Sequence, residues 1–310
     1  REMSSKQDSL ILWFKDISKE DVPIVGGKSA SLGEMTNKTS VPIPAGFCTT
    51  AKAYRVFIKE NQLDAKIAQV LSRLKDPNDT ETLRQVGQEI RNLIMQASLP
   101  KQLEDEIRKA YHELEVTIGQ ENPFVAVRSS ATAEDLPDAS FAGQQDTYLN
   151  VKGADEVIYN IKKCYASLFT DRAIFYRVQK GFDHMKVALS AVVQLMVYSK
   201  CSGVMFTLDV SNGDRSVVLI EGSWGLGEYI VQGKVTPDEY YVKKENLEIV
   251  KKNIPPKKVM LVRNPQGGVV EKEVPPELQN AQVLTDEQVK ELARYGIAIE
   301  KHYGRPMDIE

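Results

Sequence analysis

The residues with the clearest chemical potential lie between Phe124 and Tyr148. A short apolar run from Phe124 to Val127 predicts a buried strand, and this strand ends on Arg128. The residues that follow are mostly small, hydroxylic or amide, a composition that presents backbone N–H groups and hydroxyls beside one fixed cation. Phosphate is the anion that such a loop favours, because Arg offers a planar fork to its oxygens and Ser and Thr donate without bulk. A surface loop with Arg128 in a structural ion pair would have the same composition, so this stretch alone leaves both interpretations open.

A second candidate anion site is Gly26-Gly27-Lys28-Ser29. It is not a Walker A loop, because that motif requires a glycine where this chain has Val22. Two glycines and a lysine before a helix, predicted from Ser29 to Met35, still describe an anion site, since a helix N-terminus offers free N–H groups and partial positive charge. The alternative is a glycine turn with a solvated Lys28, which the local residues slightly favour.

Two carboxylates flank a glycine loop in the second half of the chain. Glu221 and Glu228 lie on either side of Gly222 to Gly227, which is not the dinucleotide-binding fingerprint because Trp224 takes a required glycine position. These carboxylates could hold Mg²⁺ or bond a ribose. They could equally be ordinary charges at a strand end and a helix start.

A further pair of carboxylates, Asp308 and Glu310, alternates around Ile309. On a strand both would point to the same side, and two oxygen donors on one face suit Mg²⁺. A frayed acidic terminus is the alternative.

Gln194 interrupts an apolar strand pattern. A buried amide needs hydrogen-bond partners, so this side chain pairs with backbone or faces a ligand with donors and acceptors, such as a nucleobase. Base rates favour the backbone.

Composition excludes several classes of protein. The chain has 40 Lys and Arg against 43 Asp and Glu, a net charge of −3 that argues against a nucleic-acid partner. Its densest basic cluster, Lys251-Lys252 with Lys257-Lys258, is interpreted as solvated strand ends. The longest apolar run, Val187 to Val197, is about half of what a bilayer requires, so no membrane span is expected. Three cysteines without a CxxC pair fit a reducing cytoplasm better than a disulfide framework or a zinc site. The three histidines show no metal spacing and are assigned no catalytic role.

The elements that must position these residues change character along the chain. Helical periodicity predicts helices over residues 51–60, 80–97, 101–116, 154–179 and 285–302, the last with a capping box from Thr285 to Gln288. Short β-branched runs predict strands over residues 10–14, 187–197, 203–208, 216–221, 239–243, 247–251, 257–263 and 268–274. We therefore expect residues 1–181 to form a mixed α/β lobe and residues 182–310 a β-rich lobe, with a ligand in the cleft between them.

Taken together, several segments resemble one family, in which they occur in the same order. The family contains phosphoenolpyruvate synthase, pyruvate phosphate dikinase and the rifampin phosphotransferases, and the resemblance covers the chain from about Trp13 onward. The segments are Gly26 to Gly33, Pro42 to Phe47, Val127 to Thr147, Gly203 to Thr207, Ser223 to Glu228 and Asp308 to Glu310.

The resemblance implies a fold and a ligand. The fold would be α/β (α+β): an ATP-grasp-like pair of nucleotide-binding subdomains, the second β-rich with a mixed or antiparallel sheet, and ATP in the cleft. Lys28 and Arg128 would contact the ATP phosphates and carry the catalysis. The remaining implied ligands of ATP and Mg²⁺ are the phosphate-covering loop of Gly143, Gln144 and Thr147 with Tyr148, Gln194 near the adenine, Glu228, and Glu310 with Asp308 at the metal.

The same resemblance implies that this chain is a fragment of a longer enzyme. In the family the phosphoryl acceptor is a histidine on a separate swivelling domain, which also visits a pyruvate-binding domain. The expected reaction converts ATP, pyruvate and water to phosphoenolpyruvate, AMP and phosphate through that phosphohistidine. The alternatives are the equivalent domain of a rifampin phosphotransferase and a nucleotide-binding module without transfer activity. An ordinary ATP-grasp ligase is disfavoured by Val127-Arg-Ser-Ser.

Overall fold

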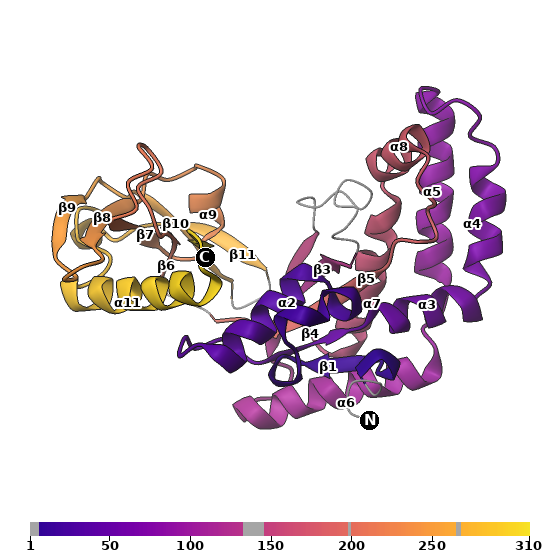
Figure 1. Cartoon of the computed structure of the whole chain (residues 1–310), viewed down its shortest axis with the longest axis horizontal. Coiled ribbons are helices and arrows are strands. Elements are labelled where there is room, and N and C mark those ends of the chain that lie inside the picture. The colour runs from indigo at the N-terminus through magenta and orange to yellow at the C-terminus, as the bar shows by residue number, and fades with distance from the viewer. Residues whose placement is uncertain (1–5, 133–145, 198–199, 265–267) are drawn as a thin grey trace. The chain divides into compact units, whose positions relative to one another are not determined.

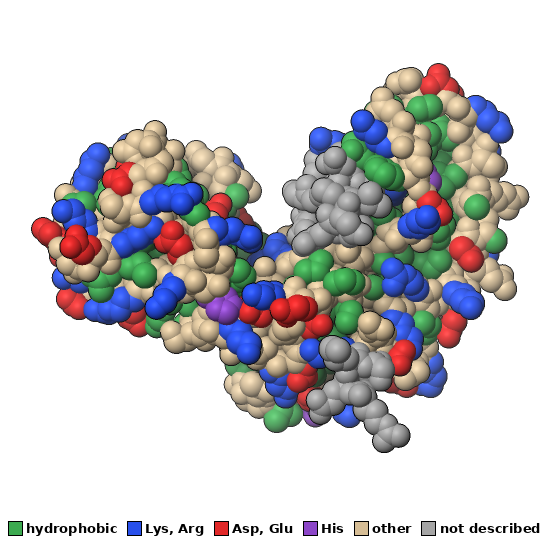
Figure 2. Space-filling view, in the orientation of Figure 1, with side chains coloured by type: hydrophobic (Ala, Val, Ile, Leu, Met, Phe, Trp, Pro, Cys, Tyr) green, Lys and Arg blue, Asp and Glu red, His purple; other side chains and the backbone are tan. Residues whose placement is uncertain are grey.

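The structure is a computed structural model that describes residues 6–132, 146–197, 200–264 and 268–310 (Figure 1). Contacts divide the chain into two units, Arg1–Asn37 with Pro42–Met196 and Lys38–Val41 with Val197–Glu310. Both units combine helices with antiparallel sheets, so the fold class is α+β. No helix in the described ranges is long and apolar enough to cross a membrane. On the face shown in Figure 2, acidic and basic side chains are interspersed over each unit.

The first unit is built on a five-stranded sheet in the order β1-β2-β5-β3-β4, in which every neighbouring pair is antiparallel. On one face of this sheet Val125, Val127 and Val193 join a large core with the helices, because alternate residues of a strand point to the same side. The strands are β1 (Ile11–Trp13), β2 (Gly46–Thr49), β3 (Phe124–Ala131), β4 (Thr147–Lys152) and β5 (Leu189–Leu195).

Six helices of the first unit contribute to that core. Their apolar residues recur at helical spacing, as on α5, which buries Val86, Ile90 and Ile94. The predicted cap of the first of these helices is confirmed, because the Thr50 hydroxyl accepts from the Ala53 N–H at 3.2 Å. The helices are α3 (Ala51–Glu60), α4 (Leu63–Leu71), α5 (Thr80–Gln96), α6 (Lys101–Ile118), α7 (Ala154–Ala166) and α8 (Asp171–Lys180).

The prediction of one continuous helix over residues 154–179 is wrong. Helix α7 passes into a 3₁₀ turn, η3 (Ser167–Phe169), and Thr170 is extended with ψ 154°. The Thr170 side chain then accepts from the Ala173 N–H and caps α8. Periodicity alone missed the break because apolar residues continue through it, whereas a Thr followed by Asp171 is an N-cap signal.

The opposite face of the same sheet carries a smaller core. There Val192 and Cys48 meet Val25 and Ala30 of α2 (Val22–Lys38). This helix follows two short 3₁₀ turns, η1 (Phe14–Asp16) and η2 (Lys19–Asp21), and is interrupted at Gly26, which has φ 79°.

The second unit contains another antiparallel five-stranded sheet, in the order β12-β6-β7-β8-β9. Helix α11 (Asp286–Tyr303) packs on one face of it, where Val289 and Ala293 meet Tyr240. The predicted capping box of this helix is confirmed by the reciprocal bonds between Thr285 and Gln288. The other elements are β6 (Cys201–Phe206), β7 (Val217–Trp224), α9 (Glu228–Val231), β8 (Asp238–Lys243), β9 (Ile249–Asn253), the hairpin of β10 (Val259–Arg263) and β11 (Val269–Glu273), α10 (Pro276–Gln279) and β12 (Asp308–Ile309).

The division between the units falls after Met196, not near Gly181, where the sequence texture placed it. Strand β5 causes the difference, because it lies between β2 and β3 in the first sheet. A change from helical periodicity to short β-branched runs marks where strands begin in the sequence. It does not reveal which sheet a strand joins.

The interpretation of Lys257 as a solvated strand end is also wrong. Its side chain is fully buried in an ion pair with Asp238, and its Nζ also donates to the Pro255 carbonyl at 2.9 Å. Asp238 accepts further bonds from the Val283 N–H and the Tyr240 hydroxyl. The pair therefore lies inside the second unit with both charges compensated.

Candidate functional site

One face of the first sheet brings together the polar residues that the sequence singled out. The registers pair Ala126 with Gln194, and Arg128 with both Val192 and Thr147. Directly paired and alternate residues share a face, so Arg128, Gln194 and Thr147 all lie on the side that carries α2.

The segment that contains Lys28 is fixed to this face by close backbone contact. The Ser29 N–H donates to the Ser130 Oγ at 3.3 Å, and the Ser29 hydroxyl lies 3.5 Å from the Ser190 hydroxyl. A Cβ on Gly26 would lie 2.3 Å from the Ser130 Oγ, so only glycine permits this approach. Ser130 is the next residue after Arg128 on the same face of β3. The structure therefore brings the half-buried Lys28 and Arg128 to the same end of one strand.

Arg128 has a buried donor that no described residue accepts. Its Nε is buried and has no hydrogen-bond partner within the described residues. Buried donors in native proteins are nearly always paired, because a donor withdrawn from water without an acceptor is costly. An anion held beside Arg128 and Lys28 would supply that acceptor.

Gln194 is bonded to backbone, as its local residues predicted. Its Nε2 donates to the Pro44 carbonyl at 3.2 Å, and the side chain is 8% exposed. This bond uses one of the four hydrogen-bonding positions of the carboxamide. A contact with adenine stays a prediction.

The described residues among those predicted to cover the phosphates lie on both faces of the first sheet. Thr147 is exposed on the Arg128 face, whereas Tyr148 pairs with Val127 and lies on the opposite, helix-packed face. The Tyr148 hydroxyl donates to an Asp146 carboxylate oxygen at 3.2 Å, and burial raises the pKa of this phenol. The Lys163 Nζ lies 4.1 Å from its ring centroid. Gly143 and Gln144 lie outside the described residues.

The carboxylates predicted to bind metal lie in the second unit. Asp308 pairs with Phe206 on β6 and Glu221 pairs with Val204, so both carboxylates lie on the sheet face opposite to α11. Glu310 is exposed, and together with Glu221 it lines a cavity of about 350 Å³. The other walls come from β6, β7 and β12, from the segment before α11, and from Leu292 within that helix.

Two acidic side chains of the second unit have raised pKa values. Burial, and then the neighbouring Glu239, raises the pKa of Glu221. Burial likewise raises the pKa of Glu228, which begins α9 directly after the glycine loop. A bound cation near either group would favour its charged form.

The donor set is compatible with magnesium held jointly with phosphates. Within the described residues no group of three or more His, Cys, Asp and Glu side chains could enclose a metal ion. Mg²⁺ commonly binds through one or two carboxylates together with substrate phosphates and water, which is what Asp308 and Glu310 offer.

Comparison with known protein families identifies the family of this chain. The pattern described as "Pyruvate phosphate dikinase, AMP/ATP-binding domain" matches residues 22–310, which is most of the chain. The chain belongs to this family.

Three curated relatives of this AMP/ATP-binding domain are named as phosphoenolpyruvate synthases. The chain is 52% identical over 99% of its length to a probable phosphoenolpyruvate synthase of Methanocaldococcus jannaschii. It is 48% identical over 97% of its length to the phosphoenolpyruvate synthase of Pyrococcus furiosus, and 48% identical over 98% to that of Neisseria meningitidis. The chain spans only 26%, 41% and 40% of these three relatives, respectively. These names favour the synthase over the rifampin phosphotransferase alternative.

Sequence reasoning missed the serines that hold the site together. Ser29, Ser130 and Ser190 come from three distant segments and lie in contact. The available signal was a serine within each of the apolar strands β3 and β5 and another directly after Lys28, but no sequence pattern links these three positions.

Proposed function

We propose that this AMP/ATP-binding domain binds ATP as the nucleotide-binding part of a phosphoenolpyruvate synthase. The observation that carries the proposal is the joint placement of Lys28 and Arg128. The Gly26–Ser29 segment contacts the end of β3 at Ser130, and Arg128 on that strand has a buried donor in need of an acceptor.

The chemistry requires positioning and charge compensation more than covalent participation. AMP as a product requires the histidine to attack the β-phosphorus of ATP with AMP as the leaving group, and the γ-phosphate is then released as phosphate by water. The charge that develops on the phosphate oxygens would be stabilised by fixed cations and N–H groups. Lys28 and Arg128 would compensate this charge, and Thr147, on the same face as Arg128, would donate to a phosphate oxygen.

The second unit would supply the metal ligands and further nucleotide contacts. Asp308 and Glu310 would hold Mg²⁺, which when bound compensates phosphate charge. Glu228, at the end of the glycine loop, would bond the ribose, and Gln194 of the first unit would approach the adenine. The two antiparallel sheets would then correspond to the two subdomains of an ATP-grasp-like fold.

The full-length enzyme would convert ATP, pyruvate and water to phosphoenolpyruvate, AMP and phosphate. The phosphoryl group would pass through a histidine on a part of the enzyme outside this chain, and pyruvate would bind on another. The shared name of the relatives and the small fraction of their length that this chain spans support this assignment.

The test is to resolve the products of ATP turnover by the full-length enzyme with pyruvate or rifampin. AMP and phosphate formed only with pyruvate are expected. AMP that required rifampin would assign the same domain to the other branch of the family. ADP as the product, or no turnover, would contradict the proposed transfer chemistry.

A further inference from the structure

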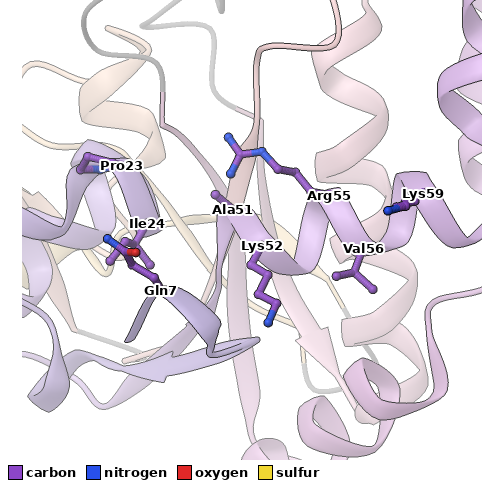
Figure 3. Close-up of a pocket in the computed structure, with 8 residues that line it drawn as sticks. All are labelled: Gln7, Pro23, Ile24, Ala51, Lys52, Arg55, Val56 and Lys59. Atoms are coloured by element: carbon purple, nitrogen blue, oxygen red, sulfur yellow. The ribbon is translucent and has the colours of Figure 1, made fainter. Parts of the chain in front are cut away.

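A basic cavity in the first unit lies outside the proposed nucleotide site. It has a volume of about 410 Å³ and is lined by Gln7, Pro23, Ile24, Ala51, Lys52, Arg55, Val56 and Lys59. None of the residues assigned above to ATP or Mg²⁺ is among them. Figure 3 shows Gln7, Pro23 and Ile24 on one side and helix α3 with its three cations on the other.

The lining of this cavity is basic. Three of its eight lining residues are cations and none is a carboxylate, although the chain as a whole has a net charge of −3. Lys52, Arg55 and Lys59 recur at helical spacing, which brings them to one side of α3.

Only one of the three cations is engaged by an acid. The Lys52 Nζ donates to the Asp8 carbonyl at 3.1 Å and lies 3.6 Å from its carboxylate. Arg55 and Lys59 are exposed, and in the described part of the chain no carboxylate lies within ion-pair distance of either. Arg84 on α5 and Arg108 on α6 differ, since each is paired with a glutamate.

The remaining walls define the kind of anion that would fit. Pro23, Ile24 and Val56 are apolar, so the cavity combines two available cations with a hydrocarbon surface. A guanidinium matches phosphate oxygens with a planar fork, and Lys59, one turn further along α3, adds a second positive charge to the lining. The volume lies within the range of small-molecule sites. We propose that this cavity binds a small organic phosphate.

The experiment is calorimetric titration of the chain with phenyl phosphate and, separately, with inorganic phosphate. The double variant Arg55→Gln/Lys59→Gln should weaken phenyl phosphate binding at least about tenfold, because it removes both charge-assisted contacts. The variant Val56→Asp, which introduces a carboxylate into the cavity, should weaken it as well. Wild-type affinity in these folded variants would overturn the proposal.

Two controls separate this cavity from the nucleotide site and from general charge. Lys66→Gln/Lys109→Gln removes two exposed lysines elsewhere in the first unit and should leave binding unchanged. Lys28→Ala/Arg128→Ala should also retain it; loss of binding in this variant would place the phosphate at the nucleotide site and overturn the proposal, without affecting the ATP assignment. Equal affinity for phenyl and inorganic phosphate would overturn the role of the apolar wall.

Discussion

Lys257 in the second unit and Arg128 in the first are both cations withdrawn from water, but their surroundings differ. Lys257 is 1% exposed and bonds both Asp238 and the Pro255 carbonyl, while Asp238 takes a further bond from the Val283 N–H. Arg128 is half-buried, and its Nε has no partner in the described part of the chain. The comparison predicts that Lys257 contributes mainly to stability, whereas Arg128 contributes mainly to binding of an anion.

The largest effect should follow removal of the compensated cation. We expect Lys257→Met to lower the free energy of unfolding by about 3–5 kcal/mol, because Asp238 would remain buried with an unpaired charge. Urea unfolding at neutral pH measures this change. Lys251→Met, on the exposed edge strand β9, is the matched control and should change stability little.

A double variant sharpens the first prediction. Asp238→Leu/Lys257→Met removes both charges, so it should recover much of the stability lost by Lys257→Met alone. If Lys257→Met were as stable as the wild type, the ion pair would contribute nothing beyond packing. Lys257 would then not be a cation that the fold requires, and the contrast with Arg128 would fail.

Removal of Arg128 should affect function instead of stability. We expect Arg128→Gln to lower the rate of phosphohistidine formation in the full-length enzyme about 100- to 1,000-fold, because it removes a fixed charge from the developing transition state. Its free energy of unfolding should stay close to the wild-type value. Quenched-flow labelling with radioactive ATP measures the rate, and Arg215→Gln, an exposed arginine of the second unit, is the control. Wild-type labelling in Arg128→Gln would remove this residue from the site.

Disruption of the contact between α2 and β3 should have an intermediate effect on stability and on ATP binding. Gly26→Ala places a Cβ 2.3 Å from the Ser130 Oγ at a residue with φ +79°, so we expect a loss of about 1–3 kcal/mol in stability and weaker ATP binding. Gly213→Ala is a matched control, because Gly213 has φ +76° but nothing within 4 Å of an added Cβ. The difference between the two variants isolates the clash from the backbone strain. Equal ATP affinity in both would show that Lys28 does not depend on this contact.

Local signals predicted much of the fold. The caps at Thr50 and Thr285 and the apolar periodicity of the helix over residues 80–97 were sufficient, because these features depend on residues close in sequence. Strand pairing was not predictable, since β5 joins the first sheet through partners at Gly46 and Ala126 that no local pattern identifies.

The candidate site was predicted in its residue types but not in its contacts. Composition and glycine spacing drew attention to Arg128 and Lys28, but only the family resemblance assigned both to phosphate. The structure adds Ser130, whose hydroxyl accepts from the Ser29 N–H. Tyr148 was included because it closes the same motif, yet strand alternation places it on the other face. Burial of Lys257 escaped prediction because its partner Asp238 is distant in sequence.

The smallest effect concerns a third buried cation, Arg177 of α8. Its Nε donates to the His184 Nδ1 at 3.0 Å, and its guanidinium also bonds the Leu168 carbonyl. Burial, and then the charge of Arg177, lowers the pKa of His184 from 6.5 to about 4. The unfolded chain therefore binds the proton more readily, so this contribution to stability is present above pH 6.5 and is lost as the pH falls towards 4. We expect the free energy of unfolding to decrease by about 1 kcal/mol per pH unit across that window.

His184→Asn tests the origin of this slope, because an amide oxygen can accept from Arg177 but does not titrate. The variant should flatten the pH dependence of urea unfolding between pH 6.5 and 4, apart from the part due to carboxylates. His112→Asn, at a side chain 74% exposed on α6, should leave the slope in place. If His184→Asn kept the wild-type slope, protonation of His184 would not be the origin of this pH dependence.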